Sequence, residues 1–150
     1  MEVYNKEKPI VFNTLQMYRH DRMDYLKALH QKAKVKDFHI GIKVVRGAYM
    51  EKERLTAKSL NIKSPICESK LETDLNFDSG LDFVFENLNR ISLVCGSHNE
   101  ESVIKIMNIM KTTLQSILAI AFISFRPPPD DILYEVFLTY LYGHLSQIIK

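Results

Sequence analysis

Three short apolar runs, each followed by polar residues and a longer amphipathic segment, constrain the fold of this chain more than any other feature. The runs lie at residues 9–12, 38–45 and 90–95. They do not alternate apolar and polar residues, which is typical of parallel strands with both faces covered. Strands that alternate with helical segments indicate βαβ units. The sequence therefore predicts an α/β fold with a parallel sheet.

The segments between the runs have the apolar spacing of helices. We expect helices at residues 19–36, 48–60 and 73–87. A fourth helix begins after Ser97 or Asn99, either of which is a suitable N-cap. The apolar stripe of the first helix consists of Met23, Leu26, Leu29 and Ala33.

Polar side chains gather just after each predicted strand, at residues 13–16, 46–49 and 97–99. In a barrel of parallel strands these positions form the C-terminal face, where active sites are built. An open parallel sheet has the same periodicity, so this pattern does not distinguish the two architectures.

Two cations, Lys43 and Arg46, lie at the exit of the second predicted strand. A cation that leaves a buried strand points at the C-terminal face, where a ligand can pair with it. Taken alone, Lys43 is better explained as a lysine whose stem lies along the strand edge. For Arg46 we expect an ion pair with a nearby acid such as Glu51 or Glu53.

Composition excludes several functional classes. The chain has 150 residues and a net charge of +2, too small to indicate nucleic acid or an anionic membrane as partner. Cys67 and Cys95 form no C-x-x-C motif, which argues against a disulfide framework or a metal site. The longest apolar run, residues 114–125, is shorter than the roughly 20 residues of a membrane span. We expect a reducing compartment.

Four motifs occur in order: N-T-L-Q-M-Y-R-H-D-R, K-V-V-R-G-A-Y-M-E-K-E-R, S-P-I-C-E-S-K-L-E-T-D-L-N-F and G-S-H-N-E-E-S. Together, over residues 3–111, they resemble the catalytic domain of the proline dehydrogenase family, flavoenzymes that oxidise proline to pyrroline-5-carboxylate. The resemblance implies a (β/α)8 TIM-type barrel with FAD at its C-terminal face. Residues 1–112 would supply about its fourth to sixth βα units. Residues 113–150 read as a divergent tail, with a weak echo of the seventh strand at 136–143.

The resemblance also implies roles at the flavin. Gln16 would hydrogen-bond the flavin, and Lys43 would stand beside its N5 atom. The backbone of Val45 and the close approach at Gly47 would face the ring. Tyr49 would pack against the substrate ring, which makes Lys43 and Tyr49 the candidate catalytic residues.

Further cofactor contacts are implied by the last two motifs. Lys70 and Thr73 would face the phosphates and the adenosine portion of FAD. Ser97, His98 and Asn99 match a T-H-N motif that contacts the cofactor, with serine keeping the hydroxyl of threonine. Lysines, hydroxyls and helix N-termini are the groups that a pyrophosphate favours.

The sequence also departs from the family pattern. The chain has no adjacent Arg-Arg pair to bind the proline carboxylate. We therefore expect an incomplete barrel whose open strand edges favour self-association. Two other functions stay open: an inactive barrel fragment or pairing module, and a barrel lyase that uses Lys43 as a Schiff-base amine.

The resemblance implies L-proline as substrate and a quinone-type electron acceptor. We expect no nucleic-acid partner, no integral membrane segment and no metal. The expected location is the cytoplasm, at a membrane periphery, or the mitochondrial matrix in a eukaryote.

Overall fold

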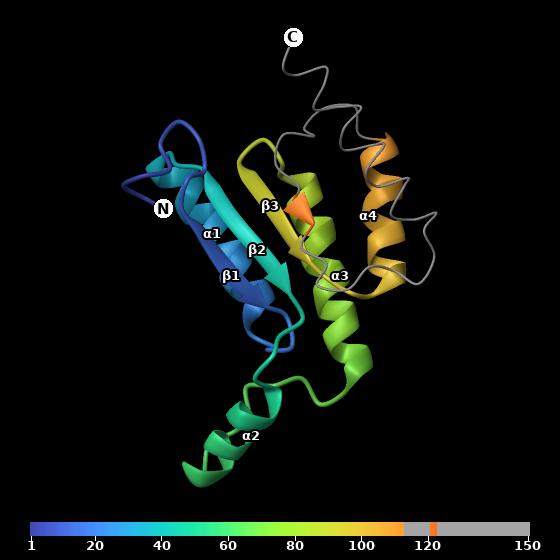
Figure 1. The fold of residues 1–150 in the computed structure, drawn as a ribbon. Helices are drawn as coiled ribbons and strands as arrows, with labels where there is room; N and C mark the ends of the chain where they lie inside the picture. The colour runs from blue at the N-terminus through green and yellow to red at the C-terminus, as the bar shows by residue number, and fades with distance from the viewer. Residues whose placement is uncertain (113–120, 123–150) are drawn as a thin grey trace.

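A computed structural model describes residues 1–112 and 121–122, and it confirms an α/β fold built on a parallel sheet (Figure 1). Within these residues the sheet has the order β1-β2-β3-β4, and every neighbouring pair is parallel. The elements are β1 (Phe12–Gln16), α1 (Arg22–Lys36), β2 (Ile40–Val45), α2 (Met50–Ser59), α3 (Lys70–Glu86), β3 (Ile91–Gly96), α4 (Glu100–Thr112) and β4 (Ala121–Phe122). Apart from β4, the predicted tail lies outside the described residues.

The first strand lies later in the chain than its apolar run predicts. The run covers residues 9–12, whereas β1 begins only at Phe12. The reason is the buried side chain of Asn5, whose Oδ1 accepts hydrogen bonds from the backbone N–H groups of Ile10 at 3.1 Å and Val11 at 2.8 Å. Because these N–H groups are already bonded, the segment forms a loop that leads into the strand.

The other predicted elements are present, and one helix begins earlier than expected. The pattern predicts that the third helix begins at Thr73, but α3 begins at Lys70. Ser69 is its N-cap, and the serine hydroxyl accepts a hydrogen bond from the Glu72 N–H at 3.0 Å. This is the S-x-x-E pattern that starts many helices.

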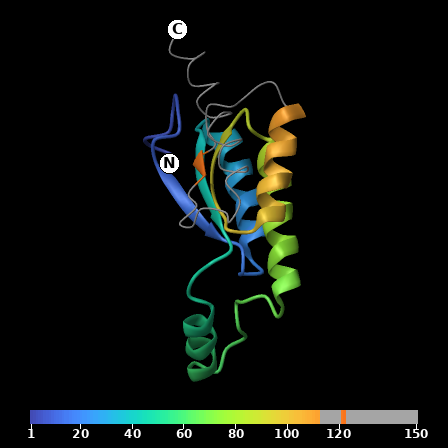
Figure 2. The same cartoon turned by 45° about the vertical axis from the view of Figure 1, so that its right-hand side comes forward.

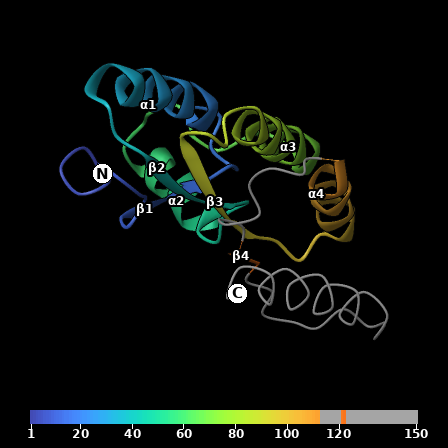
Figure 3. The same ribbon diagram turned by 90° about the horizontal axis from the view of Figure 1, so that it is seen from above.

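Helices cover one face of the sheet. Figure 3 shows α1, α3 and α4 along the same side of the strands, and Figure 2 shows them beside the sheet. The strand residues that face these helices are completely buried, and they include Leu15, Ile40, Ile42, Val44, Leu93 and Cys95. The unalternating runs predict cover on both faces, yet within the described residues no helix covers the second face. In a barrel that face looks inward, toward other strands.

Helix α2 does not belong to these layers. It leaves the sheet beyond the carboxyl end of β2 and projects away from the strands (Figures 1 and 2). Ala57 is its buried residue, while Leu55 is 67% exposed. The chain therefore makes a wide excursion between β2 and α3.

Candidate functional site

The side of the sheet that the helices leave uncovered carries most of the polar strand residues. We call it the open face. The strand register places its residues in two rows near the carboxyl ends of β1, β2 and β3. The first row consists of Thr14, Lys43 and Val94, and the second of Gln16, Val45 and Gly96. Because side chains alternate between faces along a strand, these six positions point to the same side.

Lys43 lies in the middle of the open face, on the central strand β2. Its side chain is half-buried, and within the described residues it takes part in no hydrogen bond or ion pair. Gly96 lies beside both Val45 and Lys43. A Cβ on Gly96 would be 2.9 Å from Val45 Cγ1, which is too close, and 3.6 Å from Lys43 Cε, which is an ordinary contact. Among the residues that the structure describes, Lys43 is therefore a cation on the open face without an ion-pair partner.

Arg46, three residues later, has several partners. Its Nε donates to Asp74 Oδ1 at 2.6 Å, its Nη1 to Ser97 Oγ at 3.1 Å and its Nη2 to Ser102 Oγ at 3.0 Å. The guanidinium carbon also lies 4.2 Å from the centre of the Phe77 ring. The side chains of Arg46 and Asp74 are only 23% and 24% exposed, so this ion pair is largely shielded from water.

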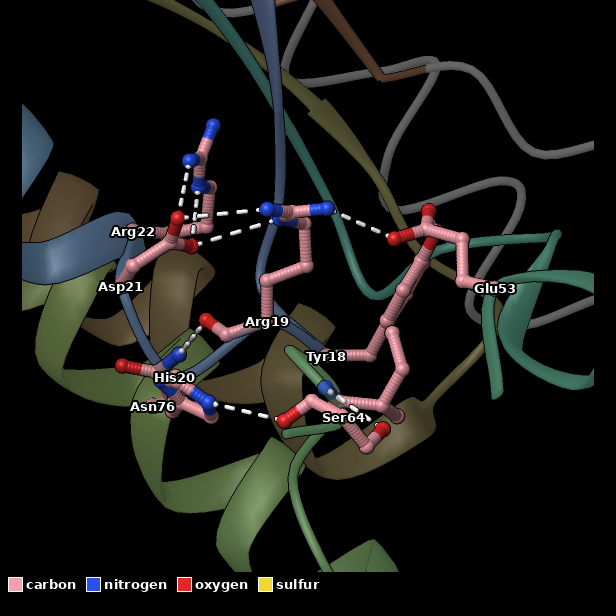
Figure 4. A network of polar contacts seen from close by, with 9 residues as sticks. Tyr18, Arg19, His20, Asp21, Arg22, Glu53, Ser64 and Asn76 are labelled. Atoms are coloured by element: carbon pink, nitrogen blue, oxygen red, sulfur yellow. Dashed lines mark hydrogen bonds and ion pairs between the residues drawn. The ribbon is translucent and has the colours of Figure 1, made fainter. Parts of the chain in front are cut away.

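The expected partners of Arg46 lie elsewhere, which corrects the sequence prediction. Glu53 accepts hydrogen bonds from the hydroxyl of Tyr18 and from Arg19 Nη1, the latter at 2.6 Å (Figure 4). Glu51 is exposed. Burial, together with the hydrogen bond to Glu53, raises the pKa of Tyr18 to about 12. These contacts tie α2 to the segment that follows β1.

The segment after β1 is held from a second side by α3. The amide of Asn76 donates to the backbone oxygens of Met17 at 2.7 Å and Arg19 at 2.9 Å. Asp21 forms ion pairs with Arg19 at 3.3 Å and Arg22 at 2.6 Å (Figure 4). The end of β1 is therefore fixed between two helices.

The N-terminus of α3 carries two predicted cofactor contacts. Lys70 is 79% exposed and pairs at 2.5 Å with Asp74, four residues later in the same helix. The hydrogen bond from Lys70, followed by that from Arg46, lowers the pKa of Asp74. Thr73 is buried, and its hydroxyl donates to the Ser69 backbone oxygen at 3.2 Å. In this structure the Thr73 hydroxyl therefore forms its hydrogen bond with the N-cap residue of its own helix.

The loop between β3 and α4 holds three more of the predicted cofactor contacts, Ser97, His98 and Asn99. Ser97 Oγ accepts a hydrogen bond from the Asn99 N–H at 3.1 Å. Asn99 Oδ1 accepts one from the Ser102 N–H at 2.9 Å, so Asn99 caps α4 as the sequence predicts. His98 is exposed. Ser97 is buried beside Arg46, and among the described residues its hydroxyl accepts two hydrogen bonds and donates none.

The remaining predicted residues lie around the end of β2. Gln16 is half-buried at the end of β1, and the Val45 carbonyl accepts the Met17 N–H at 2.8 Å. Gly47 has a φ of 132°, a conformation that favours glycine. Tyr49 is 61% exposed at the start of α2, beyond that turn. Gln16, Lys43 and Val45 are thus brought together on the open face, whereas Tyr49 is not part of it.

Three further features concern the described part of the chain. It contains no group of three or more His, Cys, Asp or Glu side chains suited to a metal ion. None of its helices is long and apolar enough to cross a membrane. Cys95 is buried, and burial raises the pKa of its thiol to about 12.

Comparison with known proteins identifies the family. The sequence pattern described as "Proline dehydrogenase" matches residues 1–122, slightly beyond the 3–111 over which the motifs resemble it. This chain belongs to the proline dehydrogenase family. It is 37% identical over 106 residues to proline dehydrogenase 1, mitochondrial, of Dictyostelium discoideum, covering 67% of this chain and 18% of that protein. It is 35% identical over 116 residues to the Caenorhabditis elegans protein of the same name, covering 74% and 19%.

A solved structure shows the same fold. Proline utilization A from Bdellovibrio bacteriovorus, inactivated by N-propargylglycine, aligns with a TM-score of 0.71 and 23% identity. The alignment covers 78% of this chain and 12% of that one. The predicted fold, a segment of the barrel of this family, is therefore confirmed. The chain spans about a fifth of the length of the two mitochondrial relatives.

Proposed function

We propose that this chain forms part of a proline dehydrogenase that oxidises L-proline to pyrroline-5-carboxylate with FAD as the hydride acceptor. Residues 1–112 would contribute the fourth to sixth βα units of its barrel. Membership of the family supports the reaction. The observation that carries the proposal is Lys43, a half-buried cation on the open face with no partner within the described residues.

The residues on the open face fit a flat cofactor that accepts negative charge. Gly96 keeps the surface beside Lys43 shallow, because a side chain there would press on Val45. Gln16 lies in the same row as Val45 and supplies an amide. Ser97 follows β3 directly, but its hydroxyl bonds Arg46 on the helix side and is not part of the open face. The open face therefore combines a cation with a neutral amide, and a ring that accepts negative charge requires such groups.

FAD, when bound, supplies a hydride acceptor at its flavin N5 atom. Lys43 would place its positive charge where negative charge develops during the reaction, in a site with little water. Gln16 would orient the ring through its amide. Lys70, at the exposed N-terminus of α3, would attract phosphates once it leaves Asp74. Tyr49 would reach the substrate only if α2 lies closer to the open face than it does here.

We further propose a quinone-type molecule as the final electron acceptor.

Strand β1 lies at the edge of the described sheet, so its outer backbone groups are available to a further strand. Self-association through this edge would supply such a strand. Without it, the chain is an inert barrel segment, and the experiment below distinguishes the two.

The test is a visible absorption spectrum of the purified chain after FAD is added and unbound FAD is removed. A retained flavin band that proline bleaches supports the proposal. A band that proline leaves unchanged indicates FAD binding without a substrate site. The absence of a band indicates that this chain alone is not an enzyme.

Lys43→Met tests the assigned role, with Lys27→Met on the exposed face of α1 as the matched control. We expect Lys43→Met to abolish bleaching by proline, whereas Lys27→Met leaves it unchanged. Both variants should unfold at the same urea concentration as the wild type. Equal bleaching rates in the two variants would refute the role of Lys43.

A further inference from the structure

We propose that Arg46 is a positioning residue, which fixes the ends of β1, β2 and β3 relative to one another and so sets the spacing of the groups on the open face. The inference rests on the proposed function in one respect, because the groups that it positions are those proposed to bind FAD. Arg46 itself lies on the helix side of the sheet and touches no open-face side chain in the described structure.

The contacts of Arg46 reach four different parts of the chain. Its backbone oxygen accepts the Tyr18 N–H at 2.7 Å, which fixes the segment after β1. Its side chain donates to Asp74 on α3, to Ser97 after β3 and to Ser102 on α4. The residue follows the last residue of β2 directly. It therefore lies where the three strand ends and two helices meet.

Arginine is suited to this role for a geometric reason. The guanidinium holds its N–H donors in a rigid plane, so three acceptors on three elements can be bound in one fixed arrangement. The Phe77 ring lies beneath that plane, 4.2 Å from the guanidinium carbon, and keeps water from it. A lysine would bring one ammonium to Asp74 and could not span the two serines in the same geometry.

The consequence for the open face follows from the chain connections. Lys43 and Val45 lie on the strand that Arg46 terminates, and Gly96 immediately precedes Ser97. If Ser97 moves away from Arg46, the end of β3 moves with it and the row Gln16–Val45–Gly96 changes its spacing. Local openings of this kind are measured by amide hydrogen exchange.

The experiment compares Arg46→Lys, Ser97→Ala and Ser97→Thr with the wild type by hydrogen exchange of the full chain. The control is Lys105→Met, which breaks another ion pair between α3 and α4, at 2.9 Å from Asp82. We expect exchange in residues 43–49 and 94–99 to rise by about tenfold or more in Arg46→Lys. Ser97→Ala should give a smaller rise, Ser97→Thr should restore the wild-type rate, and Lys105→Met should leave both segments unchanged.

A second measurement separates positioning from plain stability. FAD titration, followed by flavin fluorescence, should show about tenfold weaker binding for Arg46→Lys than for Lys105→Met at matched unfolding midpoints. If the wild type binds no FAD, the proposed function fails, and the exchange rates still decide the role of Arg46. Unchanged exchange at 43–49 and 94–99 in Arg46→Lys would overturn the positioning role. So would Ser97→Thr behaving like Ser97→Ala.

Discussion

Gly47→Ala is the substitution whose cost follows most directly from the structure. Gly47 has a φ of 132°, which an alanine rarely adopts. A Cβ at this position would lie 1.4 Å from Tyr18 Cδ1, inside the space of the ring. The ring cannot easily move, because Tyr18 is completely buried and its hydroxyl is bonded to Glu53. Either the backbone turn or the Tyr18–Glu53 contact must change.

The two effects set the magnitude. Backbone strain at such a residue costs about 1–3 kcal/mol, and overpacking costs about another 1–3 kcal/mol. The free energy of unfolding should therefore fall by about 2–6 kcal/mol, out of the roughly 5–15 kcal/mol typical of a domain. With a urea dependence of about 1–3 kcal/mol per molar, a loss of about 3 kcal/mol lowers the unfolding midpoint by about 1–3 M.

Urea unfolding followed by circular dichroism measures this shift, and Gly80→Ala is the matched control. A Cβ on Gly80 would meet Met17 Cε at 2.8 Å, the flexible end of a side chain that can turn away. Alanine is also favoured over glycine inside a helix by about 1 kcal/mol. Gly80→Ala should therefore stay within about 1 kcal/mol of the wild type. Equal midpoints for the two variants would show that Tyr18 does not pack on Gly47, and the reasoning would be wrong.

Two further predictions concern buried polar groups. Burial, followed by the charges of Lys34 and Arg90, lowers the pKa of His30 below its ordinary value of 6.5. As the pH falls, the unfolded chain therefore binds the proton before the folded chain does, and the free energy of unfolding should decrease below pH 6.5. In urea midpoints measured from pH 7 to 5, His30→Leu should show a smaller decrease than the wild type. An equal pH dependence in the variant would contradict this. Asn5→Ala should lower the free energy of unfolding by about 1–3 kcal/mol in the same assay, because it removes the partners of two backbone N–H groups. An unchanged midpoint would mean that water replaces Asn5 at no cost.

The sequence predicts β2 and β3 well because a glycine or a charged residue limits each apolar run. It misplaces β1, since the first run has the same composition whether it pairs in a sheet or not. The deciding group is Asn5, whose side chain occupies the N–H groups of Ile10 and Val11. The residues of the run do not themselves indicate these hydrogen bonds to Asn5. The early start of α3, by contrast, could have been predicted from the Ser69 and Glu72 pair.

For the site, too, the sequence predicts some positions and misses a contact between distant residues. Gln16 is the last residue of β1, Lys43 lies two residues before the end of β2, and Ser97 follows β3 directly. The sequence predicts a nearby acid as the partner of Arg46, but the partner is Asp74, 28 residues away. Nearby acids are poor candidates because α2 projects away from the sheet after Gly47. Because Ser69 caps α3, which begins at Lys70, Asp74 lies near the N-terminus of that helix and so near the carboxyl ends of the strands, which is the signal that identifies it.

The two cations at the end of β2 differ because of the alternation of a strand. Positions 43 and 46 are three residues apart, so they point to opposite faces of the sheet. Arg46 therefore meets the helices, where Asp74 compensates its charge. Lys43 points to the open face, where the described residues offer no acid, so its charge is available to a ligand. A single inserted residue between the two would place both cations on the same face of the sheet, so the spacing within K-V-V-R matters as much as the presence of two cations.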